Sequence, residues 1–247
     1  MGEENGKEVL FEITSDHLDT GLRGIPVGTC RTSFVKAKKG VHYCGYPVGD
    51  LADMDPEDIV FLLFEKRLPN RQESQDFRAE LVQRASRLPT GALRVLESLT
   101  PGSGHPMDWL SIGIQALGVA ETTGDVRADG LNLISRMPEL MAAIFRIRGG
   151  RGLPEVASEP ERGLVENFVH LLGKNDADSA EMIRVLRVFF VLHMDHGGGN
   201  LSTFTGKAVA SGWASLYASM ASAMNALSGP LHGRANQSCL EFVQRIG

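Results

Sequence analysis

The chain has 247 residues, and its 25 Lys and Arg against 30 Asp and Glu give a formal net charge of −5 at pH 7. Hydrophobic residues make up 43% and charged residues 22% of the chain, ordinary values for a soluble globular protein of one large or two small domains. The mild excess of acid argues against nucleic acid as the main partner, because binding phosphates needs a basic face.

Residues 1–22 are expected to form a loosely attached lead-in. The opening MGEENGKEVLFEITSDH is acidic and mixed, which is not the pattern of a signal peptide. Beyond it, TCRTSFV and GVHYCGY are rich in residues that favour strands, and they flank a Lys-rich turn that ends at Gly40. We therefore predict a short hairpin in this region.

After the hairpin the pattern is helical. The run from Asp55 to Asp58 combines an N-cap candidate, a proline at the first helical position and acidic side chains near the positive helix end. Apolar residues then recur at helical spacing. Helices are predicted from Asp55 to Pro69 and from Phe77 to Pro89, and over 90–99, 107–120, 124–148, 161–172, 177–193, 203–227 and 236–246. Pro138 is expected to break or to start its helix, and the predicted fold class is all-α with a small N-terminal hairpin.

The sequence predicts a cytoplasmic protein rather than a membrane protein. Val209 to Leu227 carries no charge over 19 residues, but its many Ser, Ala and Gly residues make it too weakly hydrophobic for insertion. We predict instead one buried helix over 203–227, whose small residues let neighbouring helices approach closely. The three cysteines, Cys30, Cys44 and Cys239, cannot all pair and form no CxxC motif, which favours a reduced compartment.

Two turns between predicted helices carry histidine and glycine together. The first runs from His193 to Ser202 and contains three consecutive glycines, and the second is GPLHGRANQ, from Gly229 to Gln237. A histidine at such a turn can point into a cleft, exchange a proton near neutral pH and bind a carboxylate. Two turns of this kind, separated by one buried helix, predict a ligand site.

Other interpretations of the first turn stay open. His193, Asp195 and His196 offer metal-ligand chemistry, but neither a Cys pattern nor H-E-x-x-H spacing accompanies them, and no metal site is predicted. His193 ends an apolar helix, which favours a capping or core role. Asp195 either orients a neighbouring imidazole or caps the next turn.

The two turns together resemble the citrate synthase family. HMDHGGGNLSTFT is similar to the family's H-x-D-H-x-x-x-N-x-S/A stretch, and GPLHGRANQ is similar to its G-P-L-H-G-x-A-N stretch. Three further regions resemble family segments in order and spacing: GLRGIPVGTCRTSFV with KGVHYCGYPVGDLA, HPMDWL and NFVHLLG. The resemblance covers residues 21–247.

The resemblance implies a multi-helical fold in which a large and a small domain close over the substrates, in a homodimer or a larger assembly. It implies that acetyl-CoA condenses with oxaloacetate to give citrate and CoA, without a permanently bound cofactor. His196 matches the histidine that binds oxaloacetate, and Asn200 matches the nearby site asparagine. His232 matches the histidine that hydrogen-bonds the acetyl-CoA carbonyl, and Ser202 matches the position that orients that imidazole.

Arginines are expected to contact the phosphates of CoA. The resemblance implies this role for Arg23, which matches a position that contacts a CoA phosphate in some members. Arg146, Arg148 and Arg151 are further candidates, for which a solvated basic turn is the alternative.

The sequence departs from the family pattern in two places. Family members continue past the GPLHG segment and carry there an aspartate base, a histidine in a G-x-G-H segment and carboxylate-binding arginines. The resemblance therefore implies that 23–247 is a partial large domain without the small domain, inactive alone, and self-associating near 203–227. Cys44 stands where many bacterial relatives have the arginine of Y-R-G-Y.

Three alternatives to citrate synthase stay open. The first is 2-methylcitrate synthase, which uses propionyl-CoA. The second is a non-catalytic half that binds an acyl-CoA or a dicarboxylate, and the third is a lyase that cleaves a citryl thioester.

Overall fold

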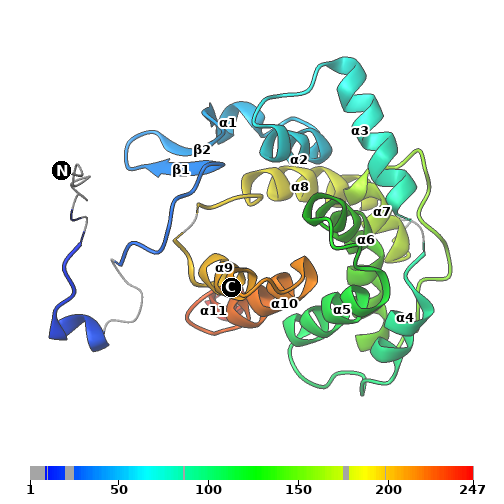
Figure 1. Cartoon of the computed structure of the whole chain (residues 1–247). Coiled ribbons are helices and arrows are strands. Elements are labelled where there is room, and N and C mark those ends of the chain that lie inside the picture. Colours follow the sequence, from blue (N-terminus) through cyan, green and yellow to red (C-terminus); the bar gives the residue numbers. More distant parts are fainter. Residues whose placement is uncertain are drawn as a thin grey trace.

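The computed structural model describes residues 9, 11–19, 25–85, 87–174, 178–197 and 199–246. These residues are mainly helical, with one antiparallel sheet near the start, so the predicted all-α class with an N-terminal hairpin is confirmed. In the lead-in, a short 3₁₀ helix, η1 (Ser15–Asp19), has no buried residue and lies away from the helical body (Figure 1).

The sheet has three short strands and is followed by helices throughout. The strands are β1 (Ser33–Lys36), β2 (Gly40–Tyr43) and β3 (Tyr46–Pro47). The helices in the described ranges are α1 (Val48–Leu51), α2 (Pro56–Glu65), α3 (Arg71–Arg84), α4 (Thr90–Glu97), α5 (Pro106–Glu121), α6 (Val126–Arg148), α7 (Leu164–Leu171), α8 (Ser179–Leu192), α9 (Leu201–Ser211), α10 (Leu216–Leu227) and α11 (Ala235–Ile246). The hairpin pairs Ser33 with Tyr43, and the third strand was not predicted.

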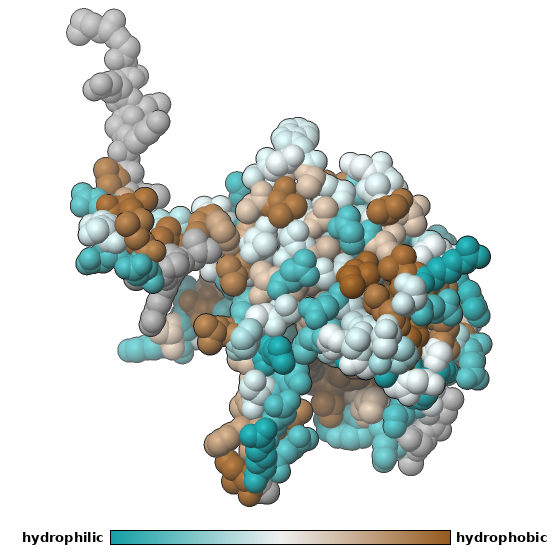
Figure 2. Space-filling model, turned by 90° about the horizontal axis from the view of Figure 1, so that it is seen from below, coloured by the Kyte–Doolittle hydropathy of each residue, from teal (hydrophilic) through white to brown (hydrophobic). Residues whose placement is uncertain are grey.

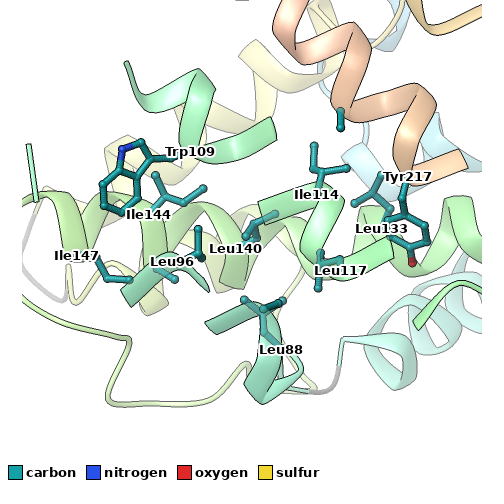
Figure 3. Close-up of a cluster of buried hydrophobic side chains, with 13 residues drawn as sticks. Leu88, Leu96, Trp109, Ile114, Leu117, Leu133, Leu140, Ile144, Ile147 and Tyr217 are labelled. Atoms are coloured by element: carbon teal, nitrogen blue, oxygen red, sulfur yellow. The ribbon is translucent and has the colours of Figure 1, made fainter. Parts of the chain in front are cut away.

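The largest apolar cluster lies between α4, α5, α6 and α10, and Figure 3 shows its side chains meeting from these helices. Two glycines of α5 allow the close packing. A Cβ atom at Gly118 would lie 2.4 Å from Cβ of Tyr217, and one at Gly113 would lie 2.7 Å from Cδ1 of Leu140. Gly118 therefore requires glycine, because an atom next to the backbone of α10 occupies the space of a side chain, whereas at Gly113 the Leu140 side chain would have to move.

Helix α6 is continuous through Pro138, so the predicted break or start at this proline is wrong. Proline lacks the N–H that would bond to the carbonyl one turn earlier, which weakens a helix locally. Here the apolar face is buried on both sides of the proline, for example at Leu133 and Leu140. Packing on both halves outweighs the lost hydrogen bond.

The single buried helix predicted over 203–227 is wrong as well. The structure has two helices here, α9 and α10, which lie side by side (Figure 1), and α9 has no buried residue. Between them Trp213 has a left-handed backbone, with φ 62°, and Ser215 caps α10 by accepting the N–H of Ala218 at 3.1 Å. Because residues 209–227 carry no charge, sequence reasoning treated them as part of one helix and missed this turn.

In the part of the chain that is described, no helix has the length and apolar character needed to cross a bilayer.

The start of α3 provides a pH-dependent contribution to stability. Arg67 donates two hydrogen bonds to Glu73, which also accepts the backbone N–H of Asn70, and these contacts lower the pKa of Glu73 to about 2. Because the pKa of this carboxyl is depressed in the folded state, its contribution is complete above its usual pKa of 4.5 and is lost as the pH falls through about 2. The variant Glu73→Gln keeps a capping side chain but loses the charge. We expect the difference in unfolding free energy between wild type and variant, from urea denaturation, to shrink over this range, and a pH-independent difference would contradict the assignment.

Candidate active site

The structure brings the two histidine-bearing turns together. The turn after α10 places His232 against the first turn of α9, where its Nε2 lies 3.1 Å from Oγ of Ser202 and accepts the Ser202 backbone N–H at 3.3 Å. Oγ of Ser202 in turn donates to Oδ1 of Asn200 at 2.8 Å. Three of the four predicted catalytic residues therefore form one connected group.

Asn200 also has a structural role. It is the N-cap of α9, and its Oδ1 accepts the backbone N–H of Thr203 at 2.8 Å. Its Nδ2 donates to the carbonyl of Gly197 at 3.4 Å. Asparagine is a preferred N-cap residue because its side chain accepts an N–H that the first helical turn leaves unpaired. The side chain of Asn200 thus fixes where α9 begins, and with it the position of Ser202.

These contacts indicate the roles of the two ring nitrogens of the half-buried His232. A backbone N–H can only donate, so Nε2 accepts it and the ring proton lies on Nδ1. Within the described ranges, Nδ1 has no hydrogen-bond partner. The arrangement therefore presents Nδ1–H as a donor to a bound molecule, as needed for polarising a carbonyl oxygen.

The fourth predicted residue, His196, is not joined to this group. Its side chain is exposed and forms no hydrogen bond with another described residue. The neighbouring His193 ends α8, bonds through Nδ1 to the carbonyl of Phe189 at 2.8 Å and stacks on that ring, so its predicted capping role is confirmed. No group of three His, Cys, Asp or Glu side chains that could hold a metal occurs among the residues that the structure describes.

Asp195 anchors the loop that carries His196 and Asn200. Its carboxylate accepts a short hydrogen bond from the Thr32 hydroxyl and the backbone N–H of Gly197 at 2.9 Å. Its own N–H donates to the hydroxyl of Tyr43 at 3.4 Å, and burial raises the pKa of that fully buried tyrosine. Asp195 therefore stabilises its own turn and also ties it to the hairpin. Sequence reasoning missed Thr32 and Tyr43, because strand-forming residues carry no signal for so distant a partner.

Removing the Thr32 hydroxyl should loosen this loop. A hydrogen bond to a charged group contributes about 1.5–3 kcal/mol. In the isosteric variant Thr32→Val, we therefore expect the amide of Gly197 to exchange with deuterium at least about tenfold faster than in wild type. Thr32→Ser keeps the hydroxyl and should exchange at nearly the wild-type rate. Equal protection in all three proteins, measured by NMR, would show that the Thr32 contact does not hold the loop.

A polar pocket of about 380 Å³ opens beside the anchored loop. It lies between the segment before β1, the loop after α8 and the start of α9, and Arg31 and Lys207 line it. Nζ of Lys207 donates to the carbonyl of Thr29 at 3.4 Å. Asp195 also lines the pocket, so its two cationic side chains outnumber one carboxylate, which suits an anionic ligand.

The predicted phosphate-binding arginines have different surroundings. Arg23 lies outside the described residues. Arg148 donates to the carbonyls of Ser103 and Gly104 and lies over the ring of Trp109. The loop that contains Ser103 and Gly104 also carries His105. Nε2 of His105 lies 2.7 Å from Oε1 of Gln237, the last residue of the second turn.

The other two arginines also have protein partners. Arg151 donates to the carbonyl of Leu172, and the largely buried Arg146 bonds to Leu153 and Glu155. Their hydrogen bonds fix these side chains against the protein. The alternative of a solvated basic turn is therefore wrong for Arg146.

Comparison with known proteins points to one family. The family profile described as "Citrate synthase, C-terminal domain" matches residues 21–247. The peroxisomal citrate synthase of Saccharomyces cerevisiae is 30% identical over 266 residues, which cover 97% of this chain and 56% of that protein. Mitochondrial citrate synthase 4 of Arabidopsis thaliana is 29% identical, over 98% of this chain and 55% of that protein.

Solved structures agree with these relatives. The crystal structure of citrate synthase from Thermotoga maritima matches with a TM-score of 0.78 and 28% identity, covering 92% of this chain and 60% of that one. Citrate synthase from Pyrobaculum aerophilum matches with a TM-score of 0.74 and 26% identity, covering 89% and 57%. The chain thus spans little more than half the length of the curated relatives that it matches.

Proposed function

Since the chain belongs to the citrate synthase family, we propose that it supplies the histidine-bearing part of a site at which acetyl-CoA condenses with oxaloacetate, giving citrate and CoA. The observation that carries this proposal is the group formed by His232, Ser202 and Asn200. It joins the two turns that resemble the family's motifs, although 30 residues separate His232 from Ser202.

His232 is the proposed donor to the thioester carbonyl. The methyl group of acetyl-CoA is a weak carbon acid, so the enolate or enol that forms from it needs a hydrogen-bond donor at its oxygen. The Ser202 N–H holds Nε2 as an acceptor, which keeps the ring proton on Nδ1. Ser202 thus orients the imidazole, and Asn200 orients Ser202.

His196 is the proposed donor to oxaloacetate. A dianionic keto acid needs several fixed donors, and an exposed imidazole on an anchored loop can supply one. The pocket beside that loop carries Arg31 and Lys207, which favours an anion there. Arg23, Arg148 and Arg151 are the proposed contacts for the phosphates of CoA, and Arg148 is linked to the second turn through the loop that carries His105.

We further propose that the chain forms part of the large domain of its fold, assembles as a homodimer or a larger oligomer, and works in the cytoplasm. Large apolar side chains of α8 and α11 are exposed, for example Val185, Phe189, Phe242 and Val243. Figure 2 shows apolar side chains interspersed among polar ones across one face. Exposed apolar surface of this kind supports association with further protein.

Histidine NMR tests the proposed binding roles directly. With ¹⁵N-labelled imidazoles, oxaloacetate is added first and a non-reactive thioether analogue of acetyl-CoA second. We expect oxaloacetate to shift the resonances of His196, and the analogue to shift those of His232, both to saturation. His193, whose Nδ1 is hydrogen-bonded to the carbonyl of Phe189, serves as the internal control and should not shift. Uniform shifts of all three, or none, would contradict the proposal.

A further inference from the structure

Two cysteines from separate segments line one small pocket. Cys30 precedes β1, and Cys44 lies in the turn between β2 and β3. Both line a pocket of about 210 Å³, to which Arg31 and Lys66 also contribute. Partly exposed thiols beside cationic side chains are typical of reactive cysteines. The third cysteine, Cys239, is exposed on α11 and lines neither this pocket nor the one beside the anchored loop.

The backbone brings these two segments together. The N–H of Cys44 donates to the carbonyl of Thr32 at 2.7 Å, which continues the hairpin register by one residue beyond the pair of Ser33 and Tyr43. Directly paired residues have Cα atoms about 5.5 Å apart. Cys30 comes only two residues before Thr32, and a bend at Arg31 and Thr32 separates it from β1. A disulfide needs a Cα separation of about 4.4–6.8 Å, so the segment before β1 must carry Cys30 to within this distance of Cys44 to close one.

The two thiols differ in their surroundings. The hydroxyls of Thr32 and Ser33 lie 3.5 and 3.7 Å from Sγ of Cys30. Burial opposes ionisation of Cys30, but its hydrogen bonds with Thr32 and Ser33, which include those to their backbone, outweigh it and lower the pKa of the thiol. Burial and the charge of Asp195 raise the pKa of Cys44. Cys30 is therefore the nucleophile of the pair, and Cys44 stays protonated until it reacts.

Cys44 occupies a strained backbone position. Its φ is 47° and that of Gly45 is 96°, so two consecutive residues of this tight turn have positive φ. Such turns favour Asn or Asp followed by Gly, and a cysteine is unusual there. In this turn the Sγ of Cys44 donates to the carbonyl of Leu62 in α2 at 3.5 Å. This weak bond is easily exchanged for a covalent one.

We propose that Cys30 and Cys44 form a reversible disulfide in the presence of hydrogen peroxide. The Cys30 thiolate attacks one peroxide oxygen, an S–O bond forms, the O–O bond breaks, and hydroxide leaves. The sulfur of Cys44 then attacks the resulting sulfenic acid, the S–O bond breaks, and the Cys44 proton leaves with the hydroxyl as water. Overall two thiols are oxidised, and one peroxide is reduced to two waters. This proposal does not depend on the proposed function.

Hydrogen peroxide added to the whole chain tests the proposal by intact mass and peptide mapping. We expect a loss of 2 Da relative to the reduced chain, a Cys30–Cys44 linked peptide, and recovery of both thiols with dithiothreitol. Cys239 should remain free for alkylation, and Cys239→Ser should behave as wild type. In Cys44→Ser the reaction should stop at the sulfenic acid of Cys30, trapped with dimedone, and Cys30→Ser should form no disulfide.

A second measurement compares alkylation rates by iodoacetamide at pH 7 in the unmodified chain, so it does not depend on how the variants fold. Cys30 should react several-fold faster than Cys239, although Cys239 is more exposed. Oxidation that begins at Cys239, a linked peptide between chains, or slower alkylation of Cys30 would overturn the proposal.

Discussion

Replacing His232 with alanine is expected to lower the turnover of the assembled enzyme about a hundred- to a thousand-fold, the usual effect of removing one donor to a developing oxyanion. The loss should appear in kcat rather than in KM for acetyl-CoA, because this hydrogen bond strengthens as negative charge develops on the carbonyl oxygen. Both constants are measured from the rate at which the CoA thiol is released at saturating oxaloacetate. The matched control is His193→Ala, which removes a nearby exposed imidazole and should change turnover less than about twofold.

Two amide variants test which ring nitrogen donates. The amide nitrogen of Asn occupies nearly the place of Nδ1 in histidine, whereas that of Gln approaches the place of Nε2. Because Nε2 already accepts the Ser202 N–H, His232→Asn should retain more turnover than His232→Gln. If His232→Gln retained activity and His232→Asn did not, the donor would be Nε2 and the assigned tautomer would be wrong. Equal turnover in wild type and alanine variant would remove His232 from the chemistry.

Replacing Gly118 with alanine is expected to destabilise the fold by about 3 kcal/mol, at the upper end of the effects of overpacking. The added Cβ would lie 2.4 Å from Cβ of Tyr217, an atom close to the backbone of α10 that cannot rotate away. Helices α5 and α10 must separate to accept it. For a chain of this size the expected fall in Tm is about 6–12 °C, measured by calorimetry or circular dichroism.

Gly91→Ala is the matched control for this effect. Gly91 lies in the exposed first turn of α4, and a Cβ there would meet no atom within 4 Å. Alanine has the higher helix propensity, so this change should stabilise the chain by about 0.5–1 kcal/mol. Opposite signs for the same substitution would show that packing, not propensity, decides the outcome at Gly118. Similar Tm values for both variants would mean that α5 and α10 do not pack so closely.

Most helices could be predicted because their signals are local. The run from Asp55 to Asp58 marks the start of α2, and apolar spacing marks α8. The two wrong helix predictions, at Pro138 and across 203–227, have one cause. In each case a local feature, a proline or a lack of charge, was given more weight than packing between distant segments.

The candidate site could be predicted only in part. Motif resemblance identified His232, Ser202 and Asn200, and the structure joins them. The motif resemblance did not indicate that Asn200 caps α9, or that Thr32 and Tyr43 anchor the loop through Asp195. These contacts depend on which distant segments pack together in the fold. A threonine or a tyrosine in a strand does not by itself indicate which distant residue it will contact.

The hydrogen bond between Thr32 and Asp195 has a consequence for the order of folding. The two residues are 163 positions apart in the chain. At ordinary rates of translation about 10–30 s pass between their synthesis. The pairing between β1 and β2 is local and can form while the ribosome is still making the helices, but the Thr32 hydroxyl cannot reach Asp195 until the segment after α8 emerges. The loop of His196 and Asn200 therefore reaches its final shape late, and any delay in that stretch of synthesis leaves a folded hairpin without an ordered site.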